Sequence, residues 1–215
     1  MAGMLVVFGA AYLALMVGGW GSWRGFFSDP ARTSLVVVTL ALFVASLFTD
    51  SSGLGSGVRE DKSNRWVIPP LIAAGFLTVW LTPYLDRHNE WVWGSEEVRW
   101  LGVFLTAVGG ILRIAPVFAL GRRFSGLVAI QQNHTLKTDG LYRVIRHPSY
   151  LGMIVGTLGW GLVFRCVAPA LLLTAVVAAV VVARMNSEER LLQDEFGDEY
   201  VEYKKKTWRL IPKVY

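Results

Sequence analysis

The sequence predicts an all-α integral membrane protein with five to six transmembrane helices. Hydrophobic residues make up 53% of the 215 residues, charged residues make up only 17%, and the mean hydropathy is +0.45. Soluble domains usually carry about 25% charged residues. The apolar residues also gather in long runs, close to the roughly 20 residues that an α-helix needs to cross a bilayer.

Six apolar runs are the expected spans. The first run lacks the basic start of a signal peptide, so we interpret it as a helix that stays in the membrane. The second run is close to the lower length limit for crossing, so a five-span arrangement with one short run outside the bilayer is the alternative. The runs are residues 4–20, 34–48, 66–85, 98–120, 148–164 and 168–185.

The fourth run contains a charged residue, Arg113. An arginine inside a span is costly unless it is paired or faces an aqueous cavity. A functional role and a structural tie between two helices are both consistent with the sequence.

The distribution of basic residues predicts the orientation. With six spans, both termini and the connectors 50–65 and 121–147 share one side, which holds most Lys and Arg residues and is therefore expected to be cytoplasmic. Because these residues lie beside apolar spans, the net charge of +5 indicates an anionic lipid surface rather than nucleic acid. We interpret residues 50–65 as a flexible connector. The other side holds only Arg24, Arg32, Arg87, Arg99 and Arg165.

Residues 140–152 form the stretch around which the chain is organised. Arg143, Arg146 and His147 directly precede Pro148, which opens an apolar run. Proline suits the first position of a helix, because its ring fixes φ and its missing N–H would be unpaired there. The positive end of the helix dipole predicts an anion site beside these basic side chains.

A second polar cluster lies just beyond the last apolar run. Arg184 and Glu188 stand four residues apart, so they share one face if the helix continues. Together with the first cluster they predict a charged pocket at the membrane surface. The alternative is a local ion pair followed by a new helix, capped by Asn186 and closed by Glu189. The cluster consists of Arg184, Asn186, Ser187, Glu188 and Glu189.

The sequence predicts no metal site. Cys166 is the only cysteine, so it has no partner for a disulfide or a CxxC motif. His134 and His147 have no third histidine or cysteine at a spacing typical of metal ligands.

Several motifs carry a resemblance to a known family. Gly-Arg-x-Phe-Ser begins at Gly121, Arg-His-Pro-Ser-Tyr-x-Gly begins at Arg146, and Glu-Glu-Arg-Leu-Leu begins at Glu188. In this order and at this spacing they resemble the isoprenylcysteine carboxyl methyltransferase family and the wider group of phospholipid methyltransferases. The resemblance covers residues 121–212, so we expect transmembrane helices in 1–120 and a catalytic region in 121–215.

The resemblance implies an integral membrane enzyme that binds S-adenosylmethionine without a Rossmann domain. The pocket would be formed on the cytoplasmic side by the connector before the last helical hairpin and by an amphipathic C-terminal helix. Arg184 and Glu188 would be catalytic, with Arg184 meeting the reacting group of the acceptor. The residues implied to bind the cofactor are Gln131, His134, Thr135, Leu136, Lys137, Tyr142, His147, Pro148, Ser149, Tyr150, Glu188 and Glu189.

The expected function is methyl transfer to a lipophilic acceptor that reaches the pocket from the bilayer. A carboxylate acceptor needs no general base, and Arg184 is able to hold it through two hydrogen bonds. A thiol or a phospholipid amine would need a proton acceptor, for which His134 or a glutamate is available. A membrane reductase using NADPH and a small transporter are the alternatives from other classes.

Overall fold

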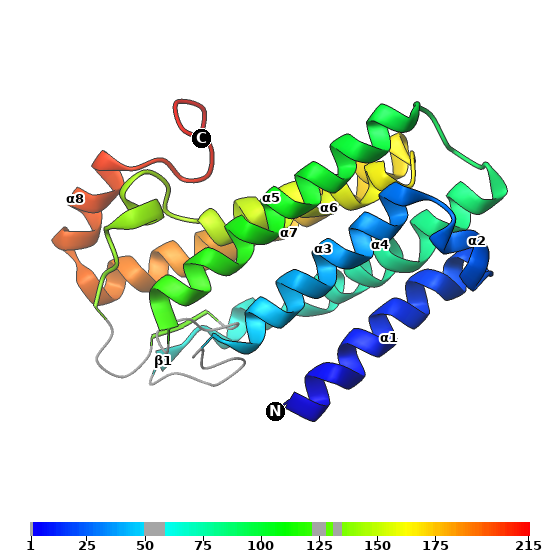
Figure 1. Ribbon diagram of the computed structural model, residues 1–215. Helices are drawn as coiled ribbons and strands as arrows, with labels where there is room; N and C mark the ends of the chain where they lie inside the picture. Colours follow the sequence, from blue (N-terminus) through cyan, green and yellow to red (C-terminus); the bar gives the residue numbers. More distant parts are fainter. Residues whose placement is uncertain (1, 50–58, 122–127, 131–134) are drawn as a thin grey trace.

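Helices make up almost all of the structure, a computed structural model that describes residues 2–49, 59–121, 128–130 and 135–215 (Figure 1). Two strands, β1 (Arg59–Glu60) and β2 (Ala129–Ile130), pair in antiparallel orientation. Two 3₁₀-helices, η1 (Lys62–Val67) and η3 (Gly140–Arg143), lie near the same end. The α-helices are α1 (Ala2–Trp20), α2 (Trp23–Phe27), α3 (Pro30–Leu47), α4 (Ile68–His88), α5 (Glu96–Leu120), α6 (Pro148–Val163), α7 (Val167–Phe196) and α8 (Asp198–Lys206).

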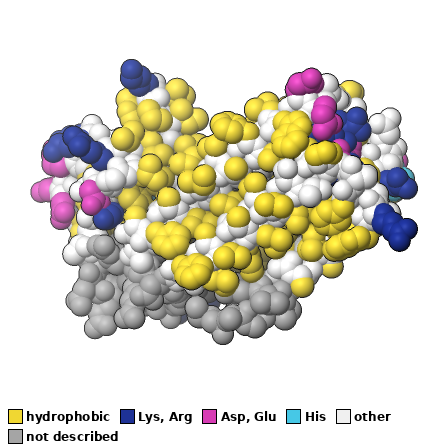
Figure 2. Space-filling model, in the orientation of Figure 1, with side chains coloured by type: hydrophobic (Ala, Val, Ile, Leu, Met, Phe, Trp, Pro, Cys, Tyr) yellow, Lys and Arg dark blue, Asp and Glu magenta, His cyan; other side chains and the backbone are white. Residues whose placement is uncertain are grey.

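The six predicted apolar runs are all helical and form one bundle, which confirms the predicted fold class. Four segments are long and apolar enough to cross a membrane by length and composition: Pro30–Leu47, Lys62–His88, Glu96–Leu120 and Val167–Phe196. Gly9–Trp20 and Pro148–Val163 are shorter apolar helices. Figure 2 shows hydrophobic side chains over the middle of the bundle and charged side chains toward its ends. Exposed residues of this apolar belt include Val37, Leu40, Ile72, Phe104 and Leu172.

Helix α7 is longer than the sequence predicted. It runs unbroken for 30 residues, whereas the predicted span ended at Met185 with a new helix capped by Asn186 as one alternative. The residues after Met185 are mostly good helix formers, so nothing local stops the helix. It ends at Gly197, where φ is 52°, a value that favours glycine. Arg184 and Glu188 therefore lie on one continuous helix face.

The connector before α4 is more ordered than predicted. A flexible connector over residues 50–65 is wrong for its second part, because β1 pairs with β2 and the Asp61 N–H donates to the Val128 carbonyl at 3.0 Å. The Asp61 side chain also accepts a hydrogen bond from the Ser63 N–H and so caps η1. Residues 50–58 lie outside the described residues. Strand β2 is a short extended piece within the connector 121–147.

Helices α5 and α6 approach so closely that their contact is built from glycines. A Cβ atom on Gly109 would lie 2.4 Å from the Gly156 nitrogen, and one on Gly152 would lie 2.5 Å from the Arg113 nitrogen. At Gly159 the nearest atom would be the Thr106 nitrogen, also at 2.5 Å. Small residues allow two helices to approach so closely. The resulting van der Waals packing stabilises the pair in lipid, where no hydrophobic driving force acts between helices.

A buried ion cluster closes the end of the bundle opposite to η1. The Asp86 carboxylate, whose side chain is fully buried, accepts hydrogen bonds from Arg99 Nη1 at 2.9 Å and from Arg165 Nη2 at 2.9 Å. Arg32 Nη1 lies 3.4 Å from the same carboxylate, and its guanidinium carbon lies 3.8 Å from the ring centroid of Trp20. The cluster joins α3, α4, α5 and the α6–α7 turn, and the sequence did not predict it.

Gly159→Ala is expected to lower the thermal stability of the protein in detergent, because the added methyl group meets backbone atoms that cannot move aside. Such overpacking costs about 1–3 kcal/mol. Gly156→Ala is the matched control on the same helix, since the nearest atom to its Cβ would be 3.9 Å away. Equal melting temperatures for the two variants would contradict the glycine contact.

Asp86→Ala is expected to be more damaging than a surface substitution. Removing one partner of a buried ion pair costs about 3–5 kcal/mol, because the arginines stay buried without their carboxylate. The measurement is the melting temperature in detergent, with the exposed Glu90→Ala nearby on the same end as the control. A melting temperature for Asp86→Ala that matches Glu90→Ala would show that the cluster contributes little.

Candidate functional site

The stretch 140–152 and the end of α7 meet, and a carboxylate from within the chain fills the predicted anion position. Glu189 Oε1 lies 3.0 Å from Arg146 Nε, 3.0 Å from His147 Nε2 and 3.3 Å from Arg209 Nε. Glu189 and His147 are both buried. The basic side chains before α6 therefore hold a carboxylate, and it is that of Glu189. This geometry favours a positioning role for Glu189.

The C-terminal segment 207–215 pairs with the residues before α6. Arg146 N donates to Trp208 O at 2.8 Å, His147 N donates to Arg209 O at 3.1 Å, and Trp208 N donates to Val144 O at 2.9 Å. The Arg209 guanidinium also donates to Asn186 Oδ1 at 2.6 Å, on α7. The turn before α6, the end of α7 and the chain terminus are thus held as one unit. No sequence motif indicated Arg209.

A second chain of hydrogen bonds joins α6 to α7 beside this unit. Arg184 Nε donates to the Tyr150 hydroxyl at 2.6 Å, and this hydroxyl donates to Glu188 Oε2 at 2.6 Å. The His147 and Tyr150 rings stack with centroids 5.5 Å apart. Arg184 is buried, whereas Glu188 is partly exposed. Tyr150 therefore fixes the guanidinium and the carboxylate relative to each other.

Two further tyrosines belong to this end of the molecule. Tyr203 on α8 donates its hydroxyl to the Tyr142 carbonyl at 2.7 Å, which holds η3 against α8. Burial, followed by the negative charge of Glu188, raises the pKa of Tyr142 above its usual range. Burial likewise raises the pKa of Tyr203. Both phenols therefore stay protonated near neutral pH and are hydrogen-bond donors.

Helix α8 turns its tyrosines inward. Tyr200 and Tyr203 are buried, while Glu199, Glu202, Lys205 and Lys206 are exposed. The predicted amphipathic C-terminal helix is thus present, and its apolar side covers protein at the site rather than facing outward.

Arg113 is a tie between two helices at the edge of this cluster. Its Nη1 donates to Ser149 Oγ, and Ser149 Oγ donates back to the Arg113 carbonyl at 3.3 Å. Of the two interpretations that the sequence left open, the helix tie is the one the geometry supports.

The connector residues that the resemblance implied are described only in part. Thr135, Leu136 and Lys137 lie just before η3, and Lys137 pairs with Asp139 at 2.8 Å. Gln131 and His134 lie outside the described residues. Pro148 is buried in the first turn of α6, and this helix begins at Pro148 as predicted.

A residue of the N-terminal half reaches this cluster, which no sequence motif indicated. Asn64 in η1 is buried, and its Nδ2 donates to Ser187 Oγ at 2.9 Å, next to Glu188. Among the described residues, Asn64 Oδ1 has no hydrogen-bond partner. A polar residue in a polar connector carries no local pattern that could reveal such a contact.

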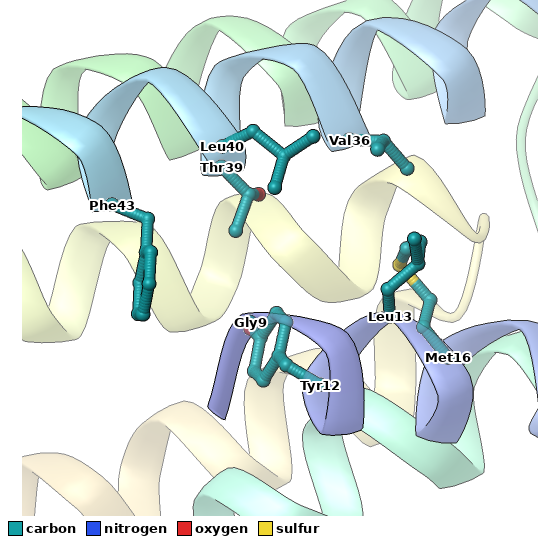
Figure 3. A pocket seen from close by; sticks show the side chains of 8 residues that line it. All are labelled: Gly9, Tyr12, Leu13, Met16, Val36, Thr39, Leu40 and Phe43. Carbon is teal, nitrogen blue, oxygen red and sulfur yellow. The ribbon is translucent and has the colours of Figure 1, made fainter. Parts of the chain in front are cut away.

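Among the described residues, neither a metal centre nor the cavity between α1 and α3 competes with this site. Within residues 2–49, 59–121, 128–130 and 135–215, no group of His, Cys, Asp and Glu side chains is arranged to hold a metal ion. A cavity of about 320 Å³ lies between α1 and α3, in the middle of the bundle (Figure 3). It offers no charged group for chemistry. Its lining residues are Gly9, Tyr12, Leu13, Met16, Val36, Thr39, Leu40 and Phe43.

Comparison with known proteins points to one family. The model of the isoprenylcysteine carboxyl methyltransferase family matches residues 100–194, which include both polar clusters. Protein-S-isoprenylcysteine O-methyltransferase A of Arabidopsis thaliana is 33% identical over 184 residues, covering 82% of this chain and 92% of that protein. The human protein-S-isoprenylcysteine O-methyltransferase is 32% identical over 133 residues, covering 59% of this chain and 47% of that protein.

The fold has a counterpart among solved structures. A eukaryotic intramembrane Ras methyltransferase, isoprenylcysteine carboxyl methyltransferase, superimposes with a TM-score of 0.54. The match covers 99% of this chain and 74% of that chain at 20% identity, so it speaks for the fold alone.

Glu189→Gln is expected to loosen the C-terminal segment, because it removes the negative charge on which the Arg146 and Arg209 guanidinium groups converge. Hydrogen–deuterium exchange in segment 207–215 should rise, and the melting temperature should fall. Glu199→Gln, at an exposed position on α8, is the control and should change neither. Unchanged exchange in Glu189→Gln would show that main-chain pairing alone holds the segment.

Proposed function

Because this chain belongs to the isoprenylcysteine carboxyl methyltransferase family, we propose that it transfers a methyl group from S-adenosylmethionine to the carboxylate of an isoprenylated cysteine. The chain is a multi-pass integral membrane methyltransferase, which decides against the NADPH-dependent reductase and the transporter. The observation that carries the finer proposal is the Arg184–Tyr150–Glu188 chain, which sets a cation and an anion side by side on one helix face.

The residues around Glu188 fit S-adenosylmethionine, which would supply a methyl group activated by its sulfonium charge. Glu188 is an acceptor for an amino group or for ribose hydroxyls, and its partly exposed side chain is accessible. Tyr142 offers an aromatic ring near this carboxylate. His147 and Glu189 are hydrogen-bonded to each other, so we propose that they hold α6 and α7 in place beside the cofactor rather than bind its carboxylate.

Arg184 is proposed to bind the carboxylate of the acceptor. Tyr150 accepts the Nε–H and so fixes the plane of the guanidinium, which suits carboxylates because its N–H groups are arranged as a fork. A carboxylate oxygen forms the new bond to the methyl carbon as the carbon–sulfur bond breaks. No proton moves, so no general base is needed. The contribution of the enzyme is alignment and the exclusion of water.

The position of the site in the bundle suits an acceptor with a lipid tail. Helix α6 has 16 residues and rises about 24 Å, which is less than the roughly 30 Å hydrocarbon core. A helix this short leaves Pro148 and the neighbouring cluster close to the depth at which acyl chains meet headgroups. We place this side in the cytoplasm because most basic residues lie in its connectors.

The test of the function is methyl transfer by the full chain in lipid nanodiscs. N-acetyl-S-farnesylcysteine should be methylated from labelled S-adenosylmethionine, and its carboxamide, in which the carboxylate is replaced, should not. The transferred label should be released as methanol in strong base, as expected of a methyl ester. Base-stable label on phosphatidylethanolamine or on a thiol would instead establish N- or S-methylation.

Glu188→Gln is expected to weaken S-adenosylhomocysteine binding about 10- to 100-fold, the effect of losing hydrogen bonds to a charged group. Isothermal titration measures the affinity, and the melting temperature reports whether the fold is retained. Glu199→Gln is the charge-matched control. Normal affinity in Glu188→Gln would remove this carboxylate from the cofactor site.

Arg184→Lys is expected to raise KM for the prenylated acceptor more than KM for S-adenosylmethionine. Lysine keeps the positive charge but loses the planar fork that holds a carboxylate through two hydrogen bonds. Initial-rate kinetics with each substrate varied in turn measures the split. Equal changes in the two KM values would contradict a role specific to the acceptor.

A further inference from the structure

The C-terminal segment 207–215 is held against helices of the membrane bundle. Leu210 is buried in the same core cluster as Tyr150 of α6 and Val177 and Val181 of α7. The main chain of Trp208 and Arg209, in the same segment, pairs with the residues that directly precede Pro148. The segment therefore lies at the level where two spans begin and end, rather than out in the aqueous phase.

The outward side of the segment is apolar. Trp208, Ile211, Val214 and Tyr215 are 44%, 46%, 74% and 44% exposed. Figure 2 shows a largely hydrophobic projection where Figure 1 marks the C-terminus. Tryptophan and tyrosine are enriched where a bilayer meets water, and lysine side chains reach from there to the headgroups. The nearby lysines are Lys204, Lys205, Lys206 and Lys213.

Most of the apolar residues of the segment have paired backbone N–H groups. Irregular backbone is costly in lipid unless its polar groups are paired. The segment closes on itself through hydrogen bonds between Ile211 and Tyr215, and Pro212 has no N–H to pair. The backbone N–H groups that donate hydrogen bonds are those of Trp208, Leu210, Ile211, Val214 and Tyr215.

We propose that residues 207–215 form an interfacial element that inserts Trp208, Ile211, Val214 and Tyr215 into the leaflet beside the Arg184–Glu188 site. The occupant of this apolar surface is lipid, because the surface continues that of the spanning helices and is flanked by lysines that suit anionic headgroups. Since the same segment supplies Arg209 to Glu189, the leaflet borders the site directly. The proposal does not depend on which acceptor is methylated.

The test uses a single fluorescent label. Cys166 is the only cysteine and is buried, so a Cys166→Ser background carries one label at an introduced cysteine. Val214→Cys is the reporter, Leu172→Cys on the exposed side of α7 is the lipid-facing control, and Glu199→Cys on α8 is the aqueous control. Each full-length variant is placed in vesicles of phosphatidylcholine and phosphatidylglycerol, and its melting temperature is checked.

Lipids carrying a nitroxide near the headgroup end of the acyl chain should quench a bimane label at position 214, as they quench the label at position 172. Iodide in the aqueous phase should quench the label at position 214 less than the label at position 199. Quenching by iodide equal to that at 199, with no quenching by the lipids, would overturn the proposal. Protection from both quenchers, together with cross-linking between two copies through position 214, would also overturn it and assign the surface to a dimer contact. These readouts do not use methyl transfer, so they stand apart from the test of the proposed function.

Discussion

The carboxylate of Glu189 is the interaction on which the rest of the site depends. It lies within 3.3 Å of cationic side chains from the turn before α6 and from the chain terminus, while it belongs to α7. Without this anion, the positive charges of Arg146 and Arg209 would lie close together in a buried place, which is strongly unfavourable. Its neighbour Glu188 is then left to face the Arg184 side of the helix. The two adjacent carboxylates thus meet different partners, because adjacent helix residues point about 100° apart.

The two ends of the bundle use charge in opposite ways. At the far end, Arg32, Arg99 and Arg165 converge on buried Asp86, and Asp29 lies beside Arg32 and Arg99 as well, so most of the few arginines there are paired with carboxylates within the protein. At the site end, the basic residues lie largely in connectors and in α8. The cytoplasmic orientation of the site end stays a prediction from the larger number of basic residues on that side.

Much of the fold could be read from the sequence because apolar runs are a local signal. The spans, the start of α6 at Pro148 and the break at Gly197 all follow from patterns a few residues long. The partners of the polar residues could not be read in this way. Asn64 meets Ser187, and the carboxylate of Glu189 meets His147, across more than 40 positions. Arg209 reaches the same carboxylate from the chain terminus, and only packing decides which charge lies beside His147. The continuity of α7 was missed because a polar stretch with a good capping residue resembles a helix start.

The glycine contact between α5 and α6 has a consequence for the precision of the site. Because backbone meets backbone there, α6 has no side-chain layer on that side that could repack and let it turn about its own axis. The direction in which Tyr150 points is therefore determined by steric exclusion along the helix, as well as by its own hydrogen bonds. A helix that cannot rotate keeps a phenol aimed at the same place even while the fluid bilayer around it changes shape.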